Sequence, residues 1–180
     1  MPVFVQPPRA ARAAYAAVAM LCASASAAAH ITASPDQGVA NSYFQTALMV
    51  PHGCQGSSTV AVKVTVPPGV YGVKPQMKSG WLITIKKRPI DPPLKNERGE
   101  PINQTVSEIE WRGGPLPADQ FDSFGLLMKL PDGAGQTVYL PVLQTGEQGV
   151  RNWSAIPAAG QAWHSLESPA PFVRLVSAVR

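Results

Sequence analysis

Short runs of hydrophobic and β-branched residues, separated by prolines and glycines, follow one another along most of this chain. The run over residues 59–66 alternates most regularly, with valine at every second position from Val60 to Val66. This period of two is typical of a half-buried strand, and turn-forming pairs such as Asp132-Gly133 separate the runs. The pattern predicts strands over residues 43–50, 59–66, 81–87, 105–111, 121–130, 137–144, 150–153 and 172–176.

No segment of ten or more residues after position 30 shows the 3.6-residue period of an amphipathic helix. Many short strands at this spacing predict an all-β fold, namely an immunoglobulin- or cupredoxin-like two-sheet β-sandwich. Residues 88–104 are charged and rich in proline, so we expect them to form a surface excursion within the domain. The sequence has neither an internal repeat nor a linker, and residues 30–180 are therefore interpreted as one domain.

The first 29 residues have the pattern of a signal peptide. Arg9 and Arg12 precede the uncharged apolar run 13–21, and the small residues 24–29 end on an Ala-x-Ala cleavage pattern. We expect cleavage after Ala29 and export to the periplasm. A lipoprotein signal at Cys22 is the alternative, but leucine precedes this cysteine where a small residue is expected.

Composition narrows the function classes further. Cleavage would lower the formal net charge from +4 to +2 because it removes two arginines and no acidic residue. The net charge is small, and the sequence has no cluster of basic residues with aromatic residues among them. Both features argue against nucleic acid as a partner. Only Cys54 would remain in the exported chain, which excludes an intramolecular disulfide.

His30 would become the first residue after cleavage and would carry a free α-amine. An amine and an imidazole on one residue can chelate a metal that favours nitrogen donors, such as Cu(II). The amine titrates near ~8, so a metal can displace its proton at neutral pH. Chance remains the alternative explanation, because any residue can follow a cleavage site.

Several short motifs run in order across nearly the whole of the predicted domain. They are His30-Ile31-Thr32, Val50-Pro51, Val64-Thr65-Val66-Pro67-Pro68-Gly69-Val70, Lys74-Pro75-Gln76, Ser79-Gly80-Trp81, Ile109-Glu110-Trp111, Phe121-Asp122-Ser123-Phe124, Trp153 and Ser168-Pro169-Ala170-Pro171. In this order and spacing the sequence resembles the YcnI-like family (domain of unknown function 1775), whose members are exported copper-binding β-sandwiches.

The resemblance implies a copper site. In that family an N-terminal histidine binds Cu(II) through its amine and ring nitrogen, a glutamate after the Val-Pro element is a further ligand, and a tryptophan lies close to the metal. The histidine corresponds to His30 and the tryptophan to Trp153, with Trp111 as the alternative. The glutamate has no counterpart, because His52-Gly53-Cys54 follows Pro51 here.

His52 and Cys54 are therefore the candidates to complete the site. Two positions apart on an extended segment, they would project to the same side and add imidazole and thiolate donors. A thiolate favours Cu(I), so Cu(I) is the alternative to Cu(II). The competing interpretations are a polar residue in a strand-end loop for His52 and a small buried hydrophobe for Cys54. Trp153 has packing in the core as its alternative. His164 is a further candidate ligand, but the favoured interpretation of this residue is a solvated loop histidine.

The sequence thus favours a periplasmic copper-binding protein that buffers copper or passes it to another periplasmic or membrane copper-handling protein. An enzyme is disfavoured because Glu108, Glu110 and Asp122 form no paired acid–base arrangement and no nucleophile motif is present. The alternatives are a copper-dependent oxidase of the histidine-brace type and a non-metal interaction domain on an immunoglobulin-like sandwich. The sequence does not determine the oligomeric state.

Overall fold

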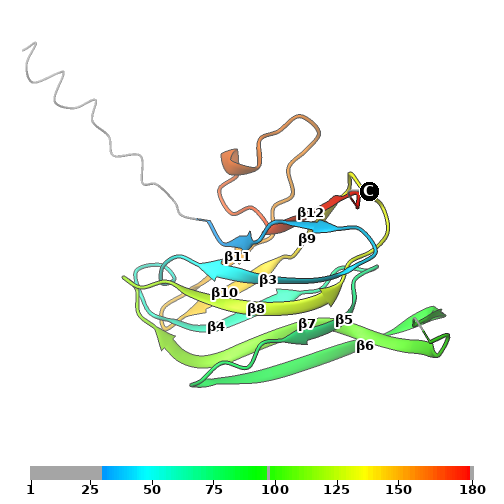
Figure 1. The fold of residues 1–180 in the computed structure, drawn as a ribbon. Coiled ribbons are helices and arrows are strands. Elements are labelled where there is room, and N and C mark those ends of the chain that lie inside the picture. Colours follow the sequence, from blue (N-terminus) through cyan, green and yellow to red (C-terminus); the bar gives the residue numbers. More distant parts are fainter. Residues whose placement is uncertain (1–29, 97, 179–180) are drawn as a thin grey trace, which may run out of the picture.

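The computed structural model describes residues 30–96 and 98–178, where the regular structure is β-strand apart from one 3₁₀ turn (Figure 1). The predicted all-β class is confirmed. The predicted signal peptide, residues 1–29, lies outside the described residues. The strands are β1 (Thr32–Ser34), β2 (Gln37–Val39), β3 (Tyr43–Val50), β4 (Thr59–Thr65), β5 (Tyr71–Pro75), β6 (Trp81–Lys95), β7 (Pro101–Leu116), β8 (Asp122–Lys129), β9 (Thr137–Tyr139), β10 (Val142–Gly146), β11 (Val150–Trp153) and β12 (Phe172–Val176), and the 3₁₀ turn is η1 (Trp163–Ser165).

Two sheets form the sandwich, and a third, smaller sheet adjoins them (Figure 1). The first has the strand order β1-β3-β8-β5 and the second has the order β11-β10-β4-β7-β6. The third, β2-β12-β9, joins an early segment to the end of the domain through parallel pairing of β2 with β12. The sequence predicted two sheets. The third combines the unpredicted β2 with β12, which was predicted, and with β9, which was predicted as part of a longer strand.

The core lies between the two larger sheets and includes the fully buried rings of Trp111, Phe124 and Trp153. Val62 and Val64 of β4 are buried as the alternation predicts. Val60 is only half-buried, because the register between β4 and β7 shifts between Thr59 and Ala61 and interrupts the alternation.

Most described residues of the segment 88–104 are exposed, as expected for a surface excursion, but the segment is not irregular. Strand β6 continues to Lys95 and β7 begins at Pro101, so most of this segment is a long hairpin (Figure 1). Strand β6 is at the edge of its sheet. Pro92 and Pro93 fall in the register shift between Pro89 and Leu94, so neither occupies a ladder position opposite β7, and no strand lies on the other side of β6.

The predicted strand 137–144 is divided in the structure. Strand β9 ends at Tyr139 in the three-stranded sheet, and β10 begins at Val142 in the five-stranded sheet. Pro141 lies between them and has no N–H to continue a ladder. Strands β1, β2 and β5 were not predicted, because segments of three to five residues are too short to show a period. Among the described residues, no helix is long and apolar enough to cross a membrane.

Candidate metal site at His30

His30 lies two positions before Thr32, the first residue of β1. The next residue, Ile31, is fully buried, and Thr32 pairs with Met49 near the end of β3. These contacts fix the backbone on one side of His30. Its half-buried imidazole lies edge-on to two indole rings, with centroid distances of 5.9 Å to Trp153 and 5.2 Å to Trp163.

Trp153 is held in place by a buried amide. Its Nε1 donates a hydrogen bond of 2.9 Å to Oε1 of Gln144, a side chain with no solvent exposure. The Gln144 Nε2 in turn donates to the Thr59 hydroxyl at 2.8 Å and to the His52 carbonyl oxygen at 3.0 Å. The amide thus has partners for both of its polar atoms, and it fixes the indole against which His30 packs.

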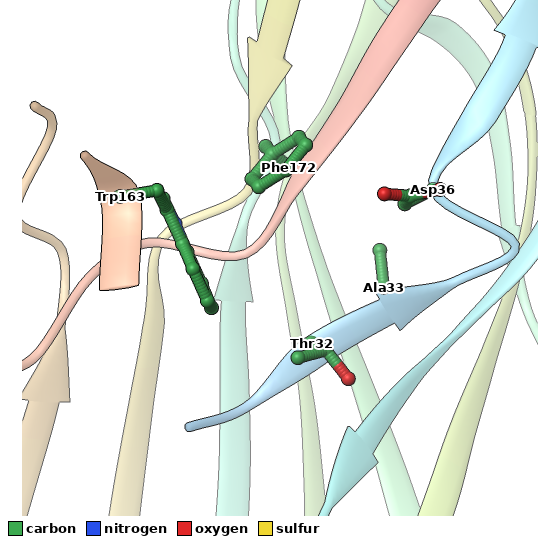
Figure 2. Close-up of a pocket in the computed structure, with 5 residues that line it drawn as sticks. All are labelled: Thr32, Ala33, Asp36, Trp163 and Phe172. Atoms are coloured by element: carbon green, nitrogen blue, oxygen red, sulfur yellow. The ribbon is translucent and has the colours of Figure 1, made fainter. Parts of the chain in front are cut away.

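Trp163 belongs to η1, in the long segment between β11 and β12. Its Nε1 donates to the Ala170 carbonyl oxygen at 2.7 Å, and its ring packs against Phe172 at 5.5 Å. Figure 2 shows Trp163 and Phe172 facing Thr32, Ala33 and Asp36 across a cavity of about 130 Å³. Trp163 was not predicted from the sequence, although its position next to the candidate ligand His164 was a usable signal.

The surroundings of His30 favour its neutral form. Burial is the largest cause that lowers the pKa of the His30 imidazole, followed by the electrostatic effects of Arg151 and His164. The Arg151 guanidinium lies over the Trp153 ring, 4.7 Å from its centroid. An uncharged imidazole keeps a lone pair available for a metal at lower pH than an ordinary histidine does.

His52 and Cys54 lie close in the sequence but differ in how deeply the structure buries them. His52 is half-buried in the turn after β3, and its Nδ1 lies within hydrogen-bonding distance of the Gly53 carbonyl oxygen. Cys54 is 1% exposed, and its Sγ lies 3.6 Å from the Gln144 carbonyl oxygen. Burial raises the pKa of the Cys54 thiol, which disfavours the thiolate that a metal requires. The placement of Cys54 therefore favours the packing interpretation.

The structure brings together His30 and Trp153, as the resemblance implies, and adds Trp163, Arg151 and His164 to them. Trp111, the alternative to Trp153, instead packs against Phe124 in the core. Within residues 30–96 and 98–178, no group of three or more His, Cys, Asp or Glu side chains could hold a metal ion. Side chains alone therefore do not form a closed metal centre in this part of the chain.

Comparisons with known proteins agree with this architecture. A search of curated proteins found no match. A crystal structure of an uncharacterised protein from Nocardia farcinica, described as having an immunoglobulin-like fold, is similar with a TM-score of 0.62 and 25% identity, over 82% of this chain and 99% of that chain. The model of the family described as domain of unknown function DUF1775 matches residues 30–175. The resemblance found in the sequence is confirmed, and the chain belongs to the DUF1775 family.

Proposed function

We propose that this protein is exported to the periplasm, binds copper through His30 at its mature N-terminus, and buffers the metal or passes it to another copper-handling protein. The observation that carries the proposal is the position of His30. It is the first residue of the family match, and its ring lies beside two indoles rather than in open solvent.

The donors at this position suit an open site. After cleavage, His30 supplies an amine and an imidazole nitrogen, a pair that favours Cu(II). Water or one further side chain would supply the remaining donors. An open site also suits transfer, because a receiving protein can reach the metal without the fold being opened. The indoles of Trp153 and Trp163 limit the approach of water to the ring.

The third donor is better sought in His164 or His52 than in Cys54. His164 acts electrostatically on His30, and His52 is linked through its carbonyl oxygen to the amide that holds Trp153. Cys54 is almost inaccessible and its thiol pKa is raised. We therefore favour Cu(II) over Cu(I) as the metal ion bound.

A binding role is favoured over catalysis by the surroundings of the carboxylates. Glu108 pairs with Lys63 and Lys86, at 3.5 Å and 2.7 Å. Glu110 pairs with Arg112 at 2.7 Å, and Asp122 pairs with Lys78 at 2.6 Å. Each carboxylate is thus held by a cation, and this ion pairing suits charges that stabilise the surface rather than a pair of groups that share a proton.

The test changes the N-terminus by one residue. The mature protein beginning at His30 is compared with a form that carries one additional alanine before His30, by copper EPR and by competition with a chelator of known affinity. The extra residue moves the amine away from the chelating ring, so we expect Cu(II) affinity to fall by more than about 100-fold, beyond the usual cost of losing a supporting contact. Equal affinities would overturn the proposal.

Substitutions of the other two histidines identify the third donor. His164→Ala and His52→Ala are matched changes, because each removes one imidazole from the mature protein and leaves His30 intact. The variant that changes the EPR hyperfine splitting identifies the ligand. If neither variant changes the spectrum, water completes the site.

A further inference from the structure

A second polar feature lies on the β6–β7 hairpin and involves Arg88. Its Nη1 donates a 2.8 Å hydrogen bond to the Val66 carbonyl oxygen. Its Nη2 is buried and has no hydrogen-bond partner. Every other buried side-chain nitrogen or oxygen in the described ranges has one. A buried charged donor without an acceptor is costly, because the group has lost its hydration and gained nothing in return.

Arg88 lines a cavity of about 200 Å³. The cavity walls are mainly apolar and include Ile90, Leu94 and the Tyr71 ring. The Thr105 hydroxyl, also in the wall, already donates to the Val70 carbonyl oxygen at 3.2 Å. Arg88 is therefore the one positively charged residue among those that line this largely apolar recess, and its unpaired Nη2 is buried.

An irregularity in the hairpin forms this recess. The register between β6 and β7 pairs Pro89 with Gln104 and then Leu94 with Ile102. Residues 90–93 therefore stand opposite the single residue Asn103 and bulge out of the ladder. Bulges redirect side chains and are frequent beside binding sites. Because β6 is an edge strand, this bulge can move without breaking the pairing of a strand on its far side.

We propose that this recess binds a carboxylate, with Arg88 as its partner and the bulge over residues 90–93 as the segment that admits it. A carboxylate oxygen accepts from the unpaired Nη2, and the hydrocarbon part of the ligand contacts Ile90 and Leu94. A singly charged planar anion suits one guanidinium better than a phosphate dianion, which needs more donors than this recess supplies.

Asp91 lines the same recess and is the competing acceptor. In the structure it makes no ion pair with Arg88. If its role is to repel weak anions, removing its charge strengthens carboxylate binding. If it is the true partner of Arg88, removing its charge destabilises the protein and does not favour an external anion. The two roles thus predict opposite outcomes for Asp91→Asn.

The experiment is a titration of the protein followed by NMR chemical-shift changes. The probes are butyrate, a short peptide with a free C-terminal carboxylate, the same peptide amidated, and inorganic phosphate. We expect saturable shifts at residues of the recess with carboxylates and none with the amidated peptide. Binding of butyrate indicates a small organic acid as the ligand, whereas binding of the free peptide alone indicates a chain terminus.

Three variants complete the test. Arg88→Met should weaken carboxylate binding by at least tenfold, and Asp91→Asn should strengthen it. Lys95→Met is the matched control, because it removes one exposed positive charge from the same strand outside the recess, and it should bind as the wild type does. Circular dichroism establishes that each variant is folded. Equal affinity of Arg88→Met and Lys95→Met would overturn the proposal, as would tighter binding of phosphate than of butyrate.

Discussion

Gln144 and Arg88 are both polar side chains placed against apolar surroundings, and they differ in how their hydrogen-bonding groups are used. Gln144 has partners for its oxygen and its nitrogen within the protein, namely Trp153, Thr59 and His52. Arg88 uses one nitrogen for Val66 and leaves another without a partner. The first arrangement is complete without a ligand, and the second is not.

This difference separates a supporting role from a binding role. A buried amide with all of its partners fixes the positions of the groups around it, which suits the support of Trp153 beside His30. A buried donor without a partner persists only where the surrounding fold holds it. It is also the feature that an incoming acceptor can stabilise. Substitutions at the two positions should therefore have unequal effects.

The largest effect is expected for Gln144→Leu. The similar volume preserves packing, but the Trp153 indole N–H and the His52 carbonyl each lose a buried partner. We expect a loss of about 1–3 kcal/mol in the free energy of unfolding, measured by urea denaturation. Gln148→Leu, at an exposed position, is the control and should stay within about 0.5 kcal/mol of the wild type. Similar losses in the two variants would contradict a structural role for the Gln144 amide.

A smaller effect is expected for Arg88→Met. The substitution loses one hydrogen bond to Val66, but it also removes the unpaired buried donor, and the two contributions oppose each other. We expect a change of at most about 1 kcal/mol in the free energy of unfolding, below that of Gln144→Leu. A greater loss than in Gln144→Leu would reverse the comparison and make Arg88 a structural group.

The smallest effect is a pH dependence at His30. Its folded-state pKa is lowered from 6.5, first by burial and then by Arg151 and His164. The unfolded chain therefore takes up a proton first on acidification, and stability falls as the pH drops through 6.5, until the folded state is protonated as well. NMR titration of the ring should show the lowered pKa, and Arg151→Gln should raise it. An unchanged pKa in this variant would exclude Arg151 as a cause.

The sequence predicted much of the fold because alternation in strands such as β4 is a local signal. It did not predict that residues 88–95 remain in β6, because the tolerance of an edge strand for proline depends on which strand lies at the edge. It singled out His30 and Trp153, and their ring centroids lie 5.9 Å apart in the structure. It did not find Trp163 or the support of Trp153 by Gln144, since both contacts join segments that approach one another only in three dimensions.

The parallel pairing of β2 with β12 has a consequence for the order of folding. Arg174 stands opposite Gln37, so this ladder forms only after almost the whole domain has been synthesised. Trp163 lies in the segment that leads into β12, and it is therefore placed beside His30 only when the two ends of the domain have met. Contacts between such distant segments form late because closing a long loop costs entropy. We expect this part of the surroundings of His30 to be assembled last, so that a partly folded chain would present this histidine without the Trp163 indole.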